Sequence, residues 1–565
     1  MEDLAADLVV VGSGAAGIMA VLSAARTDPK LQITLVSKGA IGRSGCSIMS
    51  QGFNAALDPA DSLDAHFQDV VHAGEFLNNQ ELAWQLVQDA PDTVRKLESV
   101  MGCFFDRTPE GRIHQLPFAG QSFDRKVHRG GELGLEIMSC LTDQLYNTQI
   151  RLLEHTRALD LICDDHGGIA GLALLDTRKG EAMLMRTPVV IVATGGAANM
   201  YRPSSAAKEK AGDGMAMCYR AGAAFRDMEM MQFLSVGIVS QSSGHIGLPL
   251  EERLRYVGAY LYNTLGERFM EIYESETLER ATRDQVVRAC YQEIMAGRGT
   301  AAGGVFLDAR HLGKKFLEEQ FTEIVERARS LGQDPVVQPV ELSPTAHFQI
   351  GGVIIDTDGA SNIPGLLVAG EDAGGVHGAS WTGGNGVAES TVFGARAGIH
   401  AAKLCRQRQI AAPDKQRATE IFNSVYAPLK QTGSEDPLIL SRALRNLMWR
   451  KAGPIRSATA LSEALSELQD FEERLDGVSV RGSLIANPAW AQTLDVKNLI
   501  AVAKMLLVSA LAREESRGVH FRSDFPSRND AQWLRYIVSR IGPDGPVTET
   551  RPVLTPRLVP DGKAI

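Results

Sequence analysis

The clearest pattern near the start of the chain is an apolar run, then a cluster of glycines, then a second apolar run. Residues 7–11 (Asp-Leu-Val-Val-Val) predict a buried parallel strand. Small and apolar residues continue to Arg26 and predict a helix, and residues 32–36 predict a second strand. Together they fit one strand–helix–strand unit of about 30 residues.

The pattern changes several times further along. Residues 151–190 alternate apolar stretches with turns and predict a β-meander, and residues 188–193 predict another buried strand. Between about 235 and 345 the sequence instead has the pattern of charged amphipathic helices, for example at residues 312–331. The glycine-rich pattern of an α/β domain returns at 351–398. We therefore expect a discontinuous α/β domain (1–234 and 346–410), an inserted domain (235–345), a helical domain (411–540) and an extended proline-rich tail (541–565).

Composition narrows the class of protein. The 565 residues have a formal net charge of −10, which argues against nucleic acid or an anionic membrane as the main partner. The N-terminus has no basic segment typical of a secretory signal, and the longest apolar stretch, Leu499–Ala512, is too short to span a bilayer. The seven cysteines are scattered without a C-x-x-C pair, so we expect no metal or iron–sulfur cluster bound by this chain and a cytoplasmic location.

Glycine, at 55 residues, exceeds its usual share of roughly 7% and marks places where backbone approaches a ligand. Gly12, Gly14 and Gly17 have the G-x-G-x-x-G spacing of a dinucleotide site between a strand and a helix. The second strand ends in Ser37-Lys38, where an acidic residue usually binds the ribose. This unit alone therefore leaves NAD, NADP and FAD open.

Further motifs follow in a fixed order along almost the whole chain. They are Ser44-Gly45-Cys46, Ser50-Gln51-Gly52, Ala193-Thr194-Gly195-Gly196, Gly212-Asp213-Gly214, residues 344–352 (Pro-Thr-Ala-His-Phe-Gln-Ile-Gly-Gly), Ala369-Gly370-Glu371, His377-Gly378-Ala379 and residues 513–518 (Arg-Glu-Glu-Ser-Arg-Gly). In this order they resemble the flavoprotein subunits of the succinate dehydrogenase, fumarate reductase and L-aspartate oxidase family.

The resemblance implies an α/β fold with a discontinuous, Rossmann-like FAD-binding domain, an inserted α+β capping domain and a C-terminal helical domain. It also implies FAD as the cofactor. The residues matched to FAD binding are Gly12, Gly14, Ala15, Gly17, Ser37, Lys38, Ser44, Gly45, Gln51, Gly52, Ala158, Thr194, Gly195, Asp213, Glu371, Gly386 and Val387. Asp213 and Glu371 suit hydrogen bonds from sugar or ribityl hydroxyls, although a helix-capping Asp and a solvated Glu are the alternatives. Gly45 stands where covalent members have the flavin-linking histidine, so we expect noncovalent FAD.

The family moves a hydride at flavin N5 and a proton through an arginine, and interconverts carbon–carbon single and double bonds beside a carboxylate. Ala281-Thr282-Arg283-Asp284 resembles the segment that contains this arginine, which makes Arg283 the candidate acid and base. Glu252 and Arg255 match its two relay partners by their spacing; the alternative is a pair of solvated charges on a helix face.

The dicarboxylate ligands of the family are mostly replaced. Its first substrate histidine becomes Leu234 and its substrate arginine becomes Trp381, and only His347 remains. A buried dianion would lack two of its partners, and this loss would weaken its binding by several kcal/mol. Succinate and fumarate are therefore poor candidates, and a larger, less charged substrate is favoured. An alternative role for Trp381 is packing on the flavin or at a domain interface without contact to the substrate. The alternative for His347 is a buried histidine with a purely structural role.

The resemblance thus implies an FAD-dependent oxidoreductase that acts on a small molecule. We expect it to be the catalytic subunit of a complex with an iron–sulfur or other electron-transfer subunit, through which it can be held at a membrane. The alternatives are a stand-alone amino-acid oxidase like L-aspartate oxidase, a sulfur-centre reductase similar to the alpha subunit of adenylylsulfate reductase, and a flavin-binding protein without turnover.

Overall fold

A five-stranded parallel sheet forms the base of the fold, in the order β19-β11-β2-β3-β7. Its strands are β2 (Leu8–Val11), β3 (Ile33–Val36), β7 (Arg151–Leu153), β11 (Val190–Val192) and β19 (Leu366–Val368). The structure is a computed structural model that describes residues 2–118, 120–239, 247–250 and 252–560. The central strands read as short runs of Val, Ile and Leu because helices or a second sheet cover both of their faces.

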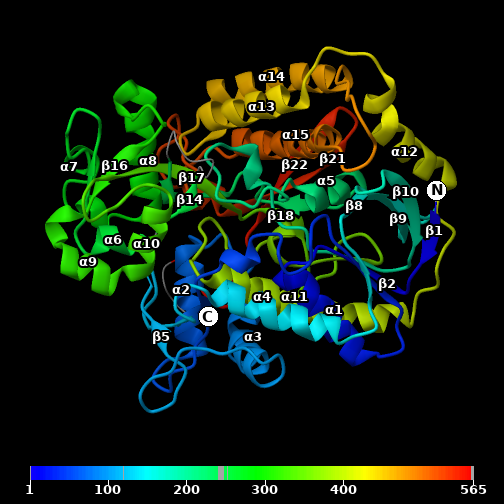
Figure 1. The fold of residues 1–565 in the computed structure, drawn as a ribbon, viewed down its shortest axis with the longest axis horizontal. Coiled ribbons are helices and arrows are strands. Elements are labelled where there is room, and N and C mark those ends of the chain that lie inside the picture. Colours follow the sequence, from blue (N-terminus) through cyan, green and yellow to red (C-terminus); the bar gives the residue numbers. More distant parts are fainter. Residues whose placement is uncertain (1, 119, 240–246, 251, 561–565) are drawn as a thin grey trace.

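One face of this sheet is covered by helices from distant parts of the chain (Figure 1). They are α1 (Ala15–Thr27), α3 (Gln80–Ser99), α4 (Leu133–Tyr146) and α11 (Asn385–Cys405). Helix α1 packs closely on α11, where Gly394 and Gly398 of α11 face the backbone of Ala16 and Ala20. The second segment of the α/β domain is thereby joined to the first, as the sequence pattern predicts.

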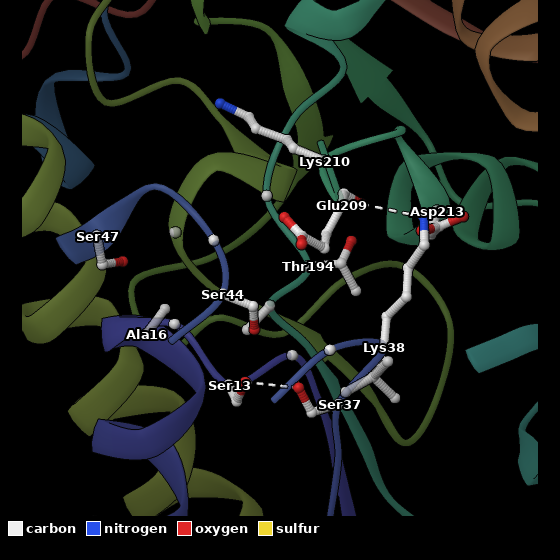
Figure 2. Close-up of a pocket in the computed structure, with 18 of the residues that line it drawn as sticks. Ser13, Ala16, Ser37, Lys38, Ser44, Ser47, Thr194, Glu209, Lys210 and Asp213 are labelled. Atoms are coloured by element: carbon white, nitrogen blue, oxygen red, sulfur yellow. Dashed lines mark hydrogen bonds and ion pairs between the residues drawn. The ribbon is translucent and has the colours of Figure 1, made fainter. Parts of the chain in front are cut away.

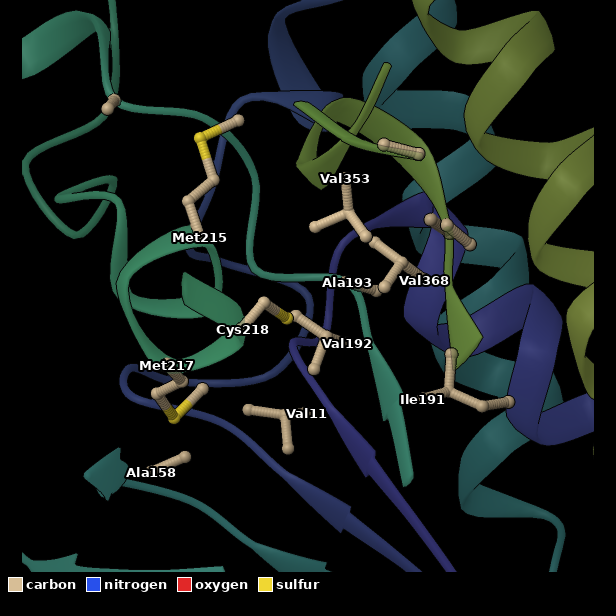
Figure 3. Close-up of a cluster of buried hydrophobic side chains, with 14 of the residues drawn as sticks. Val11, Ala158, Ile191, Val192, Ala193, Met215, Met217, Cys218, Val353 and Val368 are labelled. Atoms are coloured by element: carbon tan, nitrogen blue, oxygen red, sulfur yellow. The ribbon is translucent and has the colours of Figure 1, made fainter. Parts of the chain in front are cut away.

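The opposite face carries the predicted meander, β8 (Thr156–Cys163), β9 (Ile169–Asp176) and β10 (Glu181–Arg186), which pair antiparallel in this order. Helix α5 (Asp213–Arg220) lies beside it and closes a buried apolar layer over the sheet (Figure 3). In that layer Met215, Met217 and Cys218 of α5 lie near Val11 and Val192. This packing fixes the loops at the carboxyl ends of the parallel strands.

The inserted domain lies at one end of the molecule (Figure 1, left) and has its own apolar core. Its sheet has the order β14-β13-β17-β16-β15, with β13 (Met231–Ile238), β14 (Leu248–Pro249), β15 (Tyr260–Tyr262), β16 (Val305–Asp308) and β17 (Val340–Gln349). Helices α6 (Arg253–Tyr256), α7 (Met270–Tyr273), α8 (Arg283–Glu293), α9 (Lys314–Gln320) and α10 (Thr322–Ser330) complete it. The amphipathic stretch 312–331 is therefore two helices separated at Phe321, not one.

The expected domain borders at 234/235 and 345/346 both fall inside strands. Leu234 of β13 pairs with Thr345 of β17, so the two strands pass as one antiparallel ribbon from the α/β domain into the inserted domain. The connection is therefore made of hydrogen-bonded backbone and not of flexible linkers.

The C-terminal region contains helices α12 (Lys415–Lys430), α13 (Pro437–Ala452), α14 (Ala458–Asp476) and α15 (Pro488–Ala512). The helical pattern ends before residue 540, because β21 (Arg535–Gly542) and β22 (Gly545–Pro552) form a hairpin across the border that the sequence suggested. Pro546 and Pro552 are tolerated because β22 is an edge strand. The last five residues of the expected tail lie outside the described residues. In the described part of the chain, helices are too short or too polar to cross a bilayer.

Candidate active site

A first cavity, the dinucleotide cavity, lies at the carboxyl ends of β2, β3 and β11 (Figure 2). Gly12 has φ +110°, and a side chain there would overlap the carbonyl of Ala193. Gly14 is the N-cap of α1 and has no side chain that could accept from the amides of the first turn. The amide of Ala15 donates to Ser47 Oγ at 3.1 Å. Backbone amides and the positive end of the helix dipole are therefore directed at this cavity, an arrangement that fits a pyrophosphate.

Hydroxyl and charged side chains from separate strands surround the same cavity. The hydroxyls of Ser13 and Ser37 are 2.7 Å apart, and Lys38 Nζ lies 2.9 Å from a carboxylate oxygen of Asp213 (Figure 2). Asp213 also pairs with Arg157 and accepts a hydrogen bond from Asn498 at 2.7 Å. Burial alone would raise its pKa, but the two cations outweigh burial and hold the pKa below its usual value. Asp213 is therefore an ionised acceptor, neither solvated nor a side-chain helix cap.

Two residues that the motifs did not indicate complete this region. Lys210 is buried and its Nζ lies 2.5 Å from Glu371, so Glu371 is not solvated. Asp372 accepts backbone hydrogen bonds from Thr194 and Gly195, and burial raises its pKa to about 7. Asp372 directly follows the predicted Glu371, so two adjacent acidic residues were the sequence signal from which Asp372 could have been predicted.

A second, larger cavity of about 910 Å³, the central cavity, lies where the α/β domain meets the inserted domain. Its inner side is lined by Gln51, Gly52, Gly386 and Val387. Lys210 and Glu371 line both this cavity and the dinucleotide cavity. The two cavities therefore adjoin, and Cys46, Ser47 and Ser390 also line both of them. All the predicted site residues except Gly17 and Arg255 line one of the two cavities.

These two exceptions have structural explanations. Gly17 faces the carbonyl of Gly12, where a side chain could not fit, so its smallness allows α1 to pack on the turn. Arg255 is fully buried behind Glu252, with its Nη2 3.7 Å from that carboxylate and its Nη1 donating to the carbonyl of Glu279.

Arg283 reaches the wall of the central cavity from the first residue of α8. The helix start is fixed by a capping box between Thr282 and Gln285. Arg283 Nε and Nη2 each lie 2.8 Å from Glu252 Oε2, a paired contact on one carboxylate oxygen. Burial opposes the charge of Arg283, yet Glu252 outweighs burial and raises the pKa of the guanidinium above its usual value. Burial likewise opposes the charge of Glu252, but Arg283 and then Arg255 lower its pKa to about 2.

The three positions of the altered substrate clamp lie together beside Arg283. Leu234 of β13 is nearly buried and presents an apolar surface to the cavity. The Trp381 ring stacks on Phe348 at 5.4 Å and lies 5.6 Å from the Arg283 guanidinium carbon, and its buried indole N–H has no hydrogen-bond acceptor among the residues that the structure describes. His347 lies 5.3 Å from Trp381, and burial, followed by Lys210 and Arg283, lowers its pKa to about 3. His347 is thus neutral, with Nδ1 2.7 Å from Ser205 Oγ.

Sequence reasoning missed the hydrogen bonds that place Trp381. Gln232 accepts from the Trp381 amide at 3.0 Å and donates to Asp284 at 2.9 Å. The other Asp284 oxygen accepts from Ser380 at 3.1 Å. Gln232 is completely buried, and this network connects β13, the start of α8 and the loop before α11.

A glycine turn before a helix N-terminus, a split α/β domain and a cavity beside an inserted domain are typical of a dinucleotide-dependent oxidoreductase. Comparison with known proteins gives the family. The FAD binding domain model matches residues 7–387, and the model for the fumarate reductase flavoprotein C-terminal region matches residues 441–563. The chain therefore belongs to the family of fumarate reductase and succinate dehydrogenase flavoprotein subunits and L-aspartate oxidase, and it binds FAD.

Individual relatives match along most of their length. The chain is 37% identical to a subunit of the CoM/CoB fumarate reductase of Methanothermobacter marburgensis, with 94% of this chain and 96% of that protein covered. It is 33% identical to the L-aspartate oxidase of Streptomyces coelicolor, with 96% and 92% covered. A solved quinol-fumarate reductase with menaquinol molecules superposes with a TM-score of 0.92 at 30% identity, covering 99% of this chain and 100% of that chain. The expected fold class is thereby confirmed.

Proposed function

We propose that this chain is the catalytic flavoprotein subunit of an oxidoreductase that reduces or dehydrogenates a carbon–carbon bond next to a carboxylate or carbonyl. In this proposal Arg283 gives or takes the proton, and the substrate is neither succinate nor fumarate. The observation that supports it most directly is the contrast within the central cavity. Arg283 is paired with Glu252, whereas the same cavity is lined by Leu234 and Trp381, the residues that the resemblance matches to two carboxylate ligands of the family.

FAD, when bound, supplies hydride transfer at its N5 atom. The chain must therefore exclude water, orient the substrate and move a proton. A guanidinium normally holds its proton too tightly to act as an acid, so it needs a partner that restores the proton at once. Once Arg283 has given up its proton, the strongest cause of the low pKa of Glu252 is gone. Glu252 then becomes basic enough to accept and pass a proton, while Arg255 keeps its carboxylate from binding one permanently.

The substrate is oriented by the remaining polar groups of the cavity. With its proton on Nε2, neutral His347 can donate to a single carboxylate or carbonyl while its Nδ1 accepts from Ser205 Oγ. Trp381 adds the face of its ring beside Arg283, because its indole N–H is itself buried. Leu234 favours an apolar substituent at the position opposite. This set fits a mono-anionic or neutral enoate or enone better than a dicarboxylate.

We propose that a second protein exchanges electrons with the FAD of this chain. The relative from M. marburgensis is itself one subunit of a larger enzyme. We therefore assign electron exchange to an iron–sulfur or other redox subunit, which can also place the complex at a membrane.

The function is tested by reducing the FAD of the purified protein with light and adding candidate acceptors without oxygen. We expect cinnamate-like or crotonate-like enoates to restore the oxidised flavin spectrum much faster than fumarate. Rapid reoxidation by fumarate would refute our interpretation of Leu234 and Trp381. Normal flavin content with no reoxidation by any enoate would instead favour a flavin-binding protein without turnover.

The attachment of FAD is a separate prediction. Gly45 lines the dinucleotide cavity and supplies no imidazole, and burial raises the pKa of the neighbouring Cys46, which keeps that thiol protonated and a poor nucleophile. Acid precipitation should therefore release all the yellow colour into the supernatant. Flavin that stays with the precipitated chain would show a covalent bond.

A further inference from the structure

A buried cation lies at the junction of the two cavities. Lys210 lines both the dinucleotide cavity and the central cavity, and it is only 4% exposed. Its ion-pair partner Glu371 lines both cavities as well. Of the described residues that the two cavities share, only these two carry a formal charge. A molecule that extends from one cavity into the other therefore passes this ion pair.

FAD is such a molecule. The dinucleotide cavity measures about 120 Å³, which is too small for a whole dinucleotide, whereas the adjoining central cavity measures about 910 Å³. The residues that the resemblance matches to FAD are divided in the same way, because Gly14 and Ser37 line the first cavity and Gln51 and Gly386 line the second. Since the start of α1 suits the pyrophosphate, the central cavity is left for the flavin end of the cofactor.

The ammonium group of Lys210 lies on the side of the central cavity. Figure 2 shows the Lys210 side chain extending away from Ser13 and Ser37. Its Nζ donates to the carbonyl oxygen of His347 at 3.4 Å and lies 6.0 Å from the centre of the Phe348 ring. His347 and Phe348 line the central cavity and not the dinucleotide cavity. The charge therefore faces the part of the cofactor that lies beyond the pyrophosphate.

Lys210 remains a cation despite its burial. Burial opposes the charge, but Glu371 outweighs burial and raises the pKa of the ammonium group above its usual value. Glu371 is itself fixed on both sides, since its Oε1 accepts from the Gln349 amide at 2.9 Å and its Oε2 lies 2.5 Å from Lys210 Nζ. The neighbouring Asp372 adds only a partial negative charge at neutral pH, because burial raises its pKa to about 7. One positive and one negative charge thus hold fixed positions at the junction.

Fixed charges beside a flavin change how readily it is reduced. The oxidised ring is neutral, and a ring that takes up two electrons and one proton is an anion. A cation held in a site from which water is excluded stabilises this anion and leaves the neutral ring almost unaffected. Because Glu371 holds Lys210 in place before electrons arrive, little reorganisation is needed when the ring becomes charged. The carboxylate of Glu371 acts in the opposite sense to the ammonium group.

We infer that Lys210 tunes the reduction potential of the FAD: its ammonium group stabilises the reduced, anionic cofactor relative to the oxidised one, and Glu371 limits the effect. The inference rests on FAD binding and not on the identity of the substrate or on the role of Arg283. It can therefore fail while the proposed function stands, and it can stand if no enoate reoxidises the flavin.

The test is a redox titration of the FAD-loaded protein against a reference dye, without substrate and without oxygen. Lys210→Met keeps the length of the side chain and removes its charge. The ratio of the affinities for reduced and oxidised FAD should then fall at least about tenfold, which lowers the potential of a two-electron couple by about 30 mV. Lys210→Arg should restore most of this shift. Glu371→Gln leaves the charge of Lys210 uncompensated and should move the potential in the opposite direction.

The matched control is Lys208→Met, because Lys208 is exposed two residues earlier and lines neither cavity. Its potential should equal that of the unaltered protein. An unchanged potential in Lys210→Met, or shifts of the same sign in Lys210→Met and Glu371→Gln, would overturn the inference. A Lys210→Met chain that loses affinity for both redox forms equally, or binds neither, would also overturn it, since that is the effect of a residue that only holds the cofactor.

Discussion

The dinucleotide cavity and the central cavity lie side by side, yet they respond to sequence in different ways. The first is built from backbone: amides at the start of α1, the strained turn at Gly12 and loops held by Asp372. The second is built from side chains that point into open space, such as Arg283, Leu234 and Trp381. A binding site formed by backbone groups tolerates few substitutions, because a new side chain there disturbs the main chain. In a site formed by side chains, a single substitution can change which ligand is bound.

The proposed proton donor and the residues proposed to select the substrate also differ in how they are held within the central cavity. Arg283, Glu252 and Arg255 form a closed group in the inserted domain that pairs internally. Trp381 contacts this group from outside, since its carbonyl accepts from Arg283 Nη1 at 3.2 Å and its ring centre lies 5.6 Å from the guanidinium carbon. A change at Trp381 therefore alters the surroundings of Arg283, whereas the ion pair of Arg283 with Glu252 lies within the inserted domain.

The largest effect is expected at the proton donor. Arg283→Ala should lower turnover by about 10³-fold or more, because no other group would deliver the proton, while FAD stays bound. Steady-state rates and the flavin-to-protein ratio measure both quantities. Arg280→Ala is the control, since Arg280 is exposed three residues earlier and lines neither cavity. Turnover that survives in the Arg283 variant would remove it from the mechanism.

A second change tests the backbone cradle. Gly12→Ala should leave the chain largely without FAD, because the new methyl group overlaps the carbonyl of Ala193 and φ is +110°. Gly167→Ala has comparable strain at φ +77° but has no atom within 4 Å of the added carbon, so it should keep its flavin. The flavin absorbance per chain compares them. Full flavin content in the Gly12 variant would contradict the assignment of the turn.

A third change attempts to reverse substrate selection. Leu234→His combined with Trp381→Arg should bind fumarate at least about tenfold more tightly, since it restores two donors for carboxylates. Leu234→Asn with Trp381→Gln adds polarity without a guanidinium and serves as the control. Titration of the flavin spectrum with fumarate measures the constant. If both double variants bind fumarate equally, charge at these positions does not decide selection.

The smallest effect concerns pH. Asp372 has a folded-state pKa of about 7, above its ordinary 3.8, so the folded protein holds a proton that the unfolded chain has lost. Its contribution to stability therefore falls as pH rises from about 4 to about 7, then levels off. Asp372→Asn should flatten the change of melting temperature between pH 5 and pH 8 by about 1–3 °C. The exposed Asp165→Asn should leave it unchanged; an equal slope in both variants would argue against a protonated Asp372.

The sequence predicted the fold well where an element is marked by a local pattern, either the period of apolar residues or the spacing of glycines. The parallel strands, α1 and the meander follow from apolar runs, and the return of the α/β domain follows from its texture. The hairpin β21–β22 was missed because its prolines lie on an edge strand, where the missing N–H costs nothing. The helix 312–331 was drawn through Phe321 because amphipathic period alone does not show a break.

The site was predicted where a motif contains the residue and missed where it depends on tertiary packing. Arg283 and Glu252 are 31 positions apart, and only the family pattern connects them before the fold does. Gln232 and Lys210 have no such pattern, since a buried Gln between two loops and a Lys beside a Glu are visible only in three dimensions. The replacement of two carboxylate ligands by Leu234 and Trp381 stays a prediction from the resemblance, and the structure adds that both residues line the central cavity.

The ribbon of β13 and β17 has a consequence for protein engineering. Residues between Leu234 and Thr345 form a cassette whose ends are register partners. This cassette contains Arg283, Glu252 and Arg255. Exchange of it between relatives would transplant the proposed proton donor together with its ion-pair partners as a single module, grafted at two adjacent backbone positions, onto a flavin scaffold that need not be redesigned.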